Sequence, residues 1–234
     1  MIICMSRFAL MLLFLLSGCV ADWRAPDDFI YRPIKTEFFD IASWQHITDD
    51  TSPIHIYIEG DGRSFNAYGM PTDDPTPHDT VLRDMAMSDN SANVVYLARP
   101  CQFIMSPSCT QSDWTDGRFS ARVIDSMADA VASVAGNRQI ILIGYSGGAM
   151  VSGLIINNNP DLDVIQWITI AGVLNHAAWT EYFGDSPLTK SLNMDIVPDV
   201  PQIHYVGSDD AVVPPDLIQI PSIADNRIIV PNAV

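Results

Sequence analysis

The sequence predicts one α/β domain, with helices on both faces of a mostly parallel central sheet. Apolar runs rich in β-branched residues recur along the chain without the strict alternation of a sheet that has one wet face. Stretches with apolar residues at helical spacing separate these runs. Glycine-rich or acidic clusters follow several predicted strands, at the carboxyl ends where parallel sheets bind their ligands. This placement favours an enzyme before any motif is considered.

The first half of the chain begins with a polar, proline-containing segment that leads to short strands near 36–44. Residues 53–62, "PIHIYIEGDG", form a β-branched run that ends in a glycine-rich turn, which indicates a buried strand entering a loop. An acidic, proline-rich loop at 70–80 precedes a short amphipathic helix. Residues 92–100 are predicted to form a strand that ends at a proline.

The second half alternates helices and strands. Residues 118–136 carry apolar side chains at helical spacing and end at a glycine, which is a helix stop signal. A strand is predicted at 138–144 and a helix at 148–158, which ends before Pro160. The remaining apolar runs are predicted strands at 164–172, 202–207 and 227–234.

Length and composition limit the classes of function. A chain of 234 residues fits one domain, and a composition of 48% hydrophobic and 17% charged residues supports a sizeable core. The formal net charge of −16 disfavours nucleic acid and anionic membrane surfaces as electrostatic partners. We therefore expect no nucleic-acid partner.

The first residues are predicted to be an export signal. An apolar stretch at 8–16, too short to span a bilayer, follows Arg7. The next residues, "LSGC" ending at Cys19, resemble the lipobox of bacterial lipoproteins. That resemblance implies cleavage before Cys19 and attachment of lipid to it. An ordinary secreted protein with an incidental cysteine is the alternative.

The lipobox resemblance also sets the expected domain boundaries. Residues 1–18 are the signal peptide, 19–30 a tether and 31–234 the folded domain. Several acyl chains on one residue anchor a protein stably to a membrane. Val20 follows the cysteine where an aspartate favours the inner membrane, so we expect attachment to the outer membrane, facing the periplasm.

Export also affects how Cys101 and Cys109 are interpreted. An oxidising compartment favours their pairing, and the loop between them is long enough to double back around Pro107. Two free thiols or a metal site are the alternatives, although a metal site lacks enough nearby ligands. We expect the disulfide, and the sequence implies no metal ion or organic cofactor.

The segment Gly144-Tyr145-Ser146-Gly147-Gly148 lies between a predicted strand and a predicted helix. A nucleophile in this setting occupies a sharp, strained turn, so glycines are needed beside it to avoid clashes. The serine Oγ then stands clear of the sheet, and the helix N-terminus directs backbone N–H groups at a developing oxyanion. Ser146 is the candidate nucleophile, and a serine in a tight turn is the alternative.

With this turn, the chain resembles the α/β-hydrolase family, and the resemblance covers most of residues 31–234. The family's chain order is serine, then acid, then histidine. Residues 204–215, "HYVGSDDAVVPP", resemble the turn that carries the acid in a Gly-x-x-Asp-x-x-Val-Pro pattern. Counting from Gly207 gives Asp210. Asp209 is the alternative acid, and an aspartate that only stabilises the turn is a further one.

Residues 57–65, "YIEGDGRSF", resemble the family's loop after the third strand, which usually reads His-Gly. The resemblance implies that Asp61 or Gly62 donates a backbone N–H to the oxyanion alongside Gly147. Glu59 replaces the usual histidine, which leaves the donor open. A plain glycine turn is the alternative.

An insertion at about 176–198 lies beside the expected active site. The segments "ARPCQ" and "WTDGRFS", with Cys109, look like those of poorly characterised exported bacterial hydrolases. Four apolar side chains of the insertion either line an acyl pocket or pack a small subdomain: Trp179, Tyr182, Phe183 and Leu188.

Serine attack needs a base, and imidazole suits this role because its pKa lies near neutrality. The chain has five histidines, and none follows Asp210, whereas the family places its histidine after the last strand. His55 and His204 fall in strand-like runs, where packing is expected. His176 follows a strand at the correct edge of the sheet and is a substitute candidate. We expect instead that the sequence is truncated before the catalytic histidine.

The sequence thus predicts an exported, lipid-anchored serine hydrolase that cleaves small-molecule carboxylic esters or related acyl compounds through an acyl-enzyme on Ser146. A catalytically inactive envelope protein that uses the same fold for binding is the alternative, favoured by the missing histidine. Peptidase or acyltransferase activity is a third possibility.

Overall fold

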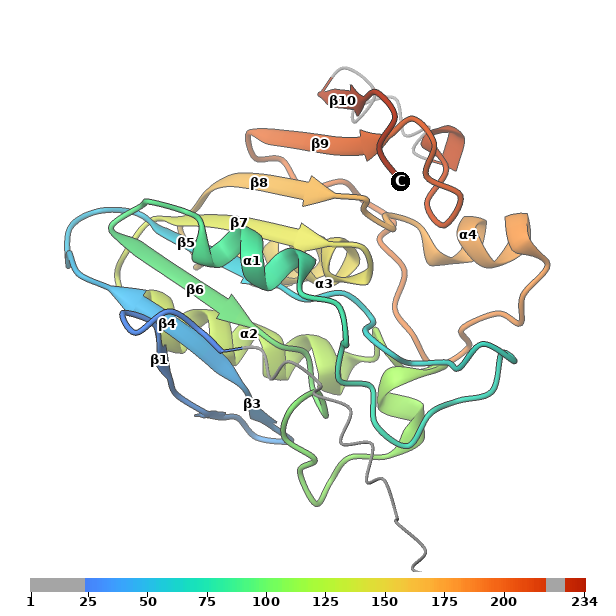
Figure 1. The fold of residues 1–234 in the computed structure, drawn as a ribbon, viewed down its shortest axis with the longest axis horizontal. Coiled ribbons are helices and arrows are strands. Elements are labelled where there is room, and N and C mark those ends of the chain that lie inside the picture. The colour runs from blue at the N-terminus through green and yellow to red at the C-terminus, as the bar shows by residue number, and fades with distance from the viewer. Residues whose placement is uncertain (1–23, 218–225) are drawn as a thin grey trace, which may run out of the picture.

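A computed structural model describes residues 24–217 and 226–234 of the chain (Figure 1). The predicted export signal and its Cys19 anchor lie outside the described residues. The described elements are, in chain order, β1 (Ile30–Tyr31), β2 (Ile34–Lys35), β3 (Asp40–Ile41), β4 (Ser43–Ile47), β5 (Ile54–Ile58), α1 (Val81–Met87), β6 (Asn93–Leu97), a 3-10 turn (Gln111–Trp114), α2 (Ala121–Ala135), β7 (Ile140–Tyr145), α3 (Gly147–Asn158), β8 (Val164–Ile170), α4 (His176–Phe183), β9 (Gln202–Gly207), a second 3-10 turn (Pro215–Leu217) and β10 (Arg227–Val230).

An eight-stranded sheet in the order β1-β4-β6-β5-β7-β8-β9-β10 forms the centre of the molecule. The pairs β1–β4 and β4–β6 are antiparallel, and every later neighbour pair is parallel. The predicted α/β class with a mostly parallel sheet is therefore confirmed. β2 and β3 pair with each other in a separate hairpin, so not all of the short strands expected near 36–44 join the central sheet.

Helices α2 and α3 lie on one face of the sheet, and α1 lies on the other (Figure 1). The apolar positions of α2 are buried against the sheet, as its helical spacing predicts, and Gly136 ends this helix with a φ of 57°. On the opposite face, Leu82 and Ala86 of α1 pack against Val94 and Tyr96 of β6. No helix among the described residues is long and apolar enough to cross a membrane.

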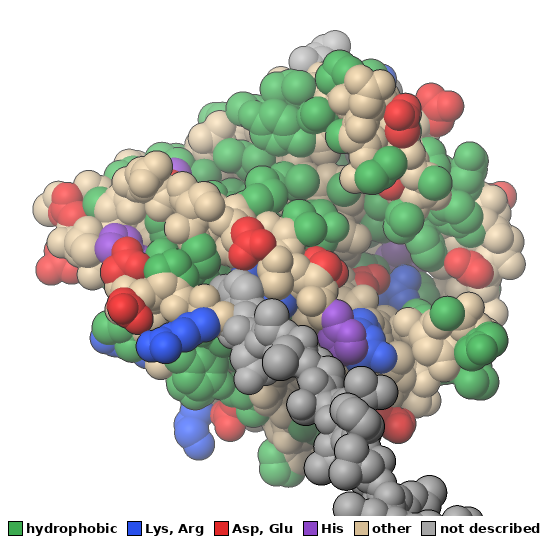
Figure 2. All heavy atoms as spheres, viewed as in Figure 1, with side chains coloured by type: hydrophobic (Ala, Val, Ile, Leu, Met, Phe, Trp, Pro, Cys, Tyr) green, Lys and Arg blue, Asp and Glu red, His purple; other side chains and the backbone are tan. Residues whose placement is uncertain are grey.

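The face that carries α1 is covered unevenly. Beyond this helix, apolar side chains of the last strands remain partly exposed, including Tyr205 of β9 (36%) and Val230 of β10 (38%). Figure 2 shows hydrophobic side chains gathered over this part of the sheet. The centre of the sheet is thus packed on both sides, whereas its β9–β10 edge is packed less completely.

Candidate active site

Ser146 lies at the junction of β7 and α3, in the backbone conformation that a nucleophile turn requires. Its φ is 49° and its ψ is −119°, a backbone conformation that residues other than glycine rarely adopt. A Cβ on Gly144 would lie 2.5 Å from the carbonyl oxygen of Gly148, and a Cβ on Gly148 would collide with the carbonyl oxygen of Ile58. Both glycines are therefore needed because the helix starts directly against the neighbouring backbone.

The backbone of Ser146 is fixed on both sides. Its N–H donates to the carbonyl oxygen of Ile170 at 2.9 Å, and its own carbonyl accepts from the N–H groups of Ala149 and Val173, each at 3.1 Å. Among the described residues, its hydroxyl makes no hydrogen bond to the protein. The serine borders two cavities, of about 740 and 680 Å³. The predicted nucleophile is thus held in a rigid turn and borders two cavities.

Asp210 follows β9 and borders the 680 Å³ cavity together with Ser146. The residue is 8% exposed, and its Oδ1 accepts the N–H groups of Val212 and Val213 at 2.8 Å each. Oδ2 has no hydrogen-bond partner among the described residues. Asp209, the alternative, is exposed and borders neither cavity, and its Oδ1 accepts from the Ser208 hydroxyl. Of the two aspartates, only Asp210 therefore shares a cavity with the serine.

The final residues run alongside Asp210. The carbonyl oxygen of Val230 accepts from the N–H of Ser208, and that of Ala233 accepts from the N–H of Asp209, both at 3.0 Å. Ala233 and Val234 line the same cavity as Ser146 and Asp210. The last described segment therefore forms part of the wall of the cavity that Ser146 and Asp210 border.

The loop after β5 carries the predicted oxyanion donors into the 740 Å³ cavity. The N–H of Gly60 is already used, because it donates to Oε1 of Glu59 at 2.8 Å. Within the described part of the chain, the N–H groups of Asp61 and Gly62 have no protein acceptor. The N–H of Gly147, at the first position of α3, has no acceptor within the helix. Within the described residues, these three N–H groups are free to donate: two on the loop that lines the larger cavity with Ser146, and one on the residue that follows the serine.

Glu59 stands where the resemblance of residues 57–65 leads us to expect a histidine, and its environment explains how an acid is tolerated there. The side chain is 2% exposed and accepts the Tyr96 hydroxyl at 2.6 Å in addition to the Gly60 N–H. Burial raises the pKa of Glu59, although these two hydrogen bonds oppose the rise. Glu59 lines the larger cavity with Ser146, but both of its carboxylate oxygens are engaged in holding the start of the loop after β5.

None of the five histidines borders either cavity that Ser146 borders. His204 is in the core, where burial lowers its pKa to about 4. His176 stacks on Phe119 with a centroid distance of 5.8 Å, and neither ring nitrogen has a hydrogen-bond partner within the described residues. Burial and the charge of Arg118 lower the pKa of His176. The other three histidines contact polar groups elsewhere: His46 with Asp28, His55 with Asp89 and His78 with Arg63.

The segment between β8 and β9 closes one side of the larger cavity. Trp179 and Leu188 line it, and the Trp179 indole N–H donates to the carbonyl oxygen of Val212 at 2.7 Å. Tyr182 and Phe183 do not line it; they contact each other and are 58% and 41% exposed. Of the four apolar residues predicted for this insertion, two therefore face the cavity and two do not.

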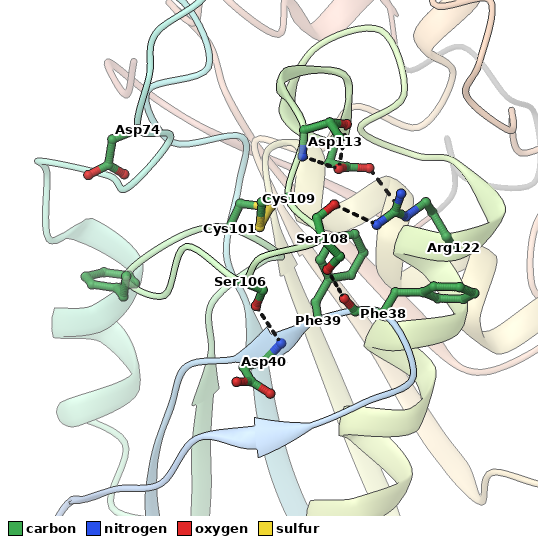
Figure 3. Close-up of a disulfide and its surroundings, with 12 residues drawn as sticks. Phe38, Phe39, Asp40, Asp74, Cys101, Ser106, Ser108, Cys109, Asp113 and Arg122 are labelled. Carbon is green, nitrogen blue, oxygen red and sulfur yellow. Dashed lines mark hydrogen bonds and ion pairs between the residues drawn. A yellow bond between two sulfur atoms is a disulfide. The ribbon is translucent and has the colours of Figure 1, made fainter.

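The predicted disulfide between Cys101 and Cys109 is confirmed, with a Cα–Cα distance of 5.9 Å (Figure 3). The loop that it closes is tied to the β2–β3 hairpin, because Ser106 Oγ accepts the Asp40 N–H at 2.9 Å and the Ser108 hydroxyl donates to the carbonyl oxygen of Phe38. The bridge therefore fixes the segment that directly follows β6.

No family model matches the chain, and no curated protein matches it in sequence. Its structure is similar to an α/β serine hydrolase without a lid from Xanthomonas campestris, at 14% identity and a TM-score of 0.55, covering 88% of this chain and 84% of that one. A serine hydrolase homologue from Coxiella burnetii matches at 14% identity and a TM-score of 0.55, covering 90% of each chain.

A hyperthermophilic esterase from Pyrobaculum calidifontis matches at 13% identity and a TM-score of 0.56, covering 88% of this chain and 74% of that chain. Similarities at sequence identities this low support a shared fold and nothing more specific. Together with the parallel strands, the flanking helices and the strand–turn–helix at Ser146, they lead to one conclusion: the chain has the α/β-hydrolase fold, with a mostly parallel eight-stranded central sheet.

Proposed function

We propose that the protein is a serine hydrolase that cleaves carboxylic esters through an acyl-enzyme on Ser146. The strained turn at Ser146, together with three N–H groups that have no acceptor among the described residues, is the observation that carries the proposal. The Ser146 oxygen attacks the ester carbonyl carbon, and the carbonyl electrons move onto the oxygen that the N–H groups bind. The leaving alcohol takes the proton lost by the serine. Water then attacks the acyl carbon, the bond to the Ser146 oxygen breaks, the serine regains a proton and the carboxylic acid is released.

The proposed reaction uses a histidine as its base. Asp210 borders the same cavity as Ser146, and within the described residues its Oδ2 is available to accept the N–H of an imidazole ring and fix its tautomer. Of the five histidines, His176 follows a strand at the correct edge of the sheet, although its ring is buried against Phe119.

The test compares three proteins: the product of the full gene and its Ser146→Ala and His176→Ala variants. With p-nitrophenyl butyrate, we expect the wild type to turn over rapidly and Ser146→Ala to lose that activity. Loss of a triad histidine or serine costs up to about 10⁶ in kcat. A Ser146→Ala variant as active as the wild type would remove the proposed nucleophile, and loss of activity in His176→Ala would assign the role of base to His176.

We further propose that the protein is exported and anchored by lipid at Cys19, for which the "LSGC" pattern is the support. Cys19→Ser should abolish incorporation of radiolabelled fatty acid and release the protein from the outer-membrane fraction. Unchanged lipid incorporation would contradict the anchor and leave the proposed hydrolase untouched.

The second candidate function is binding without turnover in the cell envelope. It is favoured by the position of the five histidines, none of which borders the cavities at Ser146. The two functions differ in one measurement on the full gene product. A binding protein retains a short-chain ester without releasing its alcohol, whereas the hydrolase releases the alcohol.

A further inference from the structure

Three charged side chains form a cluster directly beside the nucleophile turn. Asp61 follows β5, Arg99 follows β6 and Arg118 precedes α2, so three separate segments meet here. The Asp61 carboxylate accepts a hydrogen bond from Nη1 of Arg99 and lies 3.0 Å from Nε of Arg118. The two arginines are only 4% and 6% exposed. Because buried charges are costly unless paired, this geometry is strongly specified.

The cluster contacts both sides of the predicted oxyanion hole. A Cβ on Gly147 would collide with Oδ1 of Asp61 and lie 3.0 Å from Nη1 of Arg99, so the ion pair packs directly on the Gly147 backbone. Asp61 itself provides one of the free N–H groups. Gln102 completes the link, because its Oε1 accepts the Arg99 N–H at 2.9 Å and its Nε2 donates to the carbonyl oxygen of Gly60 at 3.0 Å.

Two guanidinium groups and one carboxylate leave an excess of one positive charge in this cluster. Burial opposes ionisation of Asp61, yet the charges of Arg118 and Arg99 hold its pKa below the usual range, so the carboxylate is ionised near neutral pH. The Phe119 ring packs under both guanidinium groups, at 5.1 and 5.6 Å from its centroid. The Asp61 side chain is 27% exposed and lines the 740 Å³ cavity, so the ion pair reaches the cavity wall beside Ser146.

We infer that Arg99 and Arg118 are positioning residues: they hold the Asp61 carboxylate against Gly147 and thereby set the spacing of the oxyanion donors on the two segments. The inference rests on the proposed hydrolase function. Arg99 borders neither cavity at Ser146, so it acts through Asp61 rather than by touching the substrate. Small displacements of such donors are expensive, because misplacement by about 1 Å can lower a rate about a hundredfold.

The test uses Arg99→Lys and Asp61→Asn in the full gene product. Lysine keeps the charge but loses the planar fork, and asparagine keeps the shape but loses the charge. We expect kcat for p-nitrophenyl butyrate to fall about 10- to 100-fold while KM changes less than about threefold. Affinity for a trifluoromethyl ketone, which mimics the tetrahedral oxyanion, should fall by the same factor as kcat. Arg122→Lys is the matched control, because Arg122 pairs with Asp113 at 3.6 Å and borders neither cavity.

Two results would overturn the inference: a lower melting temperature with unchanged kcat, which marks a purely structural cluster, or a raised KM with unchanged kcat, which marks a substrate contact. Should Arg99→Lys not fold, Arg118→Lys at the cavity wall gives the same reading of kcat against KM. Failure of the inference is distinct from failure of the proposed function. The first leaves an active wild type with equally active variants, whereas the second leaves a wild type without ester turnover.

Discussion

The candidate nucleophile and the candidate acid are held by very different surroundings. Ser146 lies at the centre of the sheet, where β7 pairs with β5 and β8 and Gly148 packs against the Ile58 backbone. Asp210 follows β9, and in the described part of the sheet only β10 lies beyond it, with Val230 38% exposed. The central core thus dictates the geometry of the serine, whereas the acid depends on a thinly packed edge. Changes at the centre and at the edge should therefore have different consequences.

The largest expected effect is on activity at the edge. Asp210→Asn in the full gene product should lower kcat about 10⁴-fold, because the equivalent change in a serine–histidine–aspartate triad leaves histidine in the wrong tautomer. Asp209→Asn is the matched control and should stay within about twofold, since Asp209 is exposed and borders neither cavity. Steady-state ester hydrolysis checks both. Equal loss in the two variants would remove Asp210 from its role.

A change at the centre should act on folding instead. Gly148→Ala places a methyl group against the carbonyl oxygens of Ile58 and Glu59, and we expect a loss on the order of 4 kcal/mol in the free energy of unfolding. Gly69→Ala is the control, because nothing lies within 4 Å of its Cβ position and only its φ of 71° is strained, at about 1 kcal/mol. Urea titration measures both. Equal stabilities would show that the turn is looser than its contacts indicate.

Lowering the pH should decrease the free energy of unfolding through His204 on β9. An unfolded histidine titrates near pH 6.5, while burial lowers the folded pKa to about 4. The unfolded state therefore binds more protons between these values. Stability is complete above about pH 6.5 and falls by up to about 3 kcal/mol as the pH drops toward 4. Urea titrations at pH 7.5 and 5 should show this loss of stability with falling pH, and His204→Gln should reduce it. The exposed His78→Asn should keep it, and an unchanged slope in His204→Gln would contradict the assignment.

The smallest effect is expected at the disulfide, which lies away from both the centre and the β9–β10 edge. Replacing Cys101 and Cys109 by serine opens a loop that spans eight positions, which costs about 2–3 kcal/mol in the chain-entropy model. Thermal unfolding under oxidising and reducing conditions measures this difference in the wild type. The double serine variant should match the reduced wild type, and a loss beyond that would mean that the serines disturb the packing.

The same contrast decides how much the sequence predicts. Ser146 and Gly148 are found from the sequence because the turn is local, and its strain leaves a glycine pattern next to the serine. Asp210 is predicted because residues 207–214 resemble the Gly-x-x-Asp-x-x-Val-Pro pattern of the α/β-hydrolase family, and the structure shows its Oδ1 accepting the N–H groups of Val212 and Val213. The strands and helices follow from their apolar spacing, with small shifts at their ends. These features need only neighbours in the chain.

Features that join distant segments are not found in this way. Asp61, Arg99 and Arg118 belong to segments that stand out in the sequence, yet nothing in their spacing shows that three loops bring them together. The position of the His176 ring depends on Phe119, which is also distant in sequence. Burial makes these contacts specific, and burial is a property of the folded chain.

The most direct test of the central claim is covalent capture of the nucleophile. The full gene product is treated with a fluorophosphonate, digested and mapped by mass spectrometry. We predict one phosphonylated residue, Ser146, with labelling abolished in Ser146→Ala and strongly slowed in Asp210→Asn, while both variants keep the wild-type melting temperature within a few degrees. Labelling at another residue, or equal labelling of wild type and Ser146→Ala, would contradict the account.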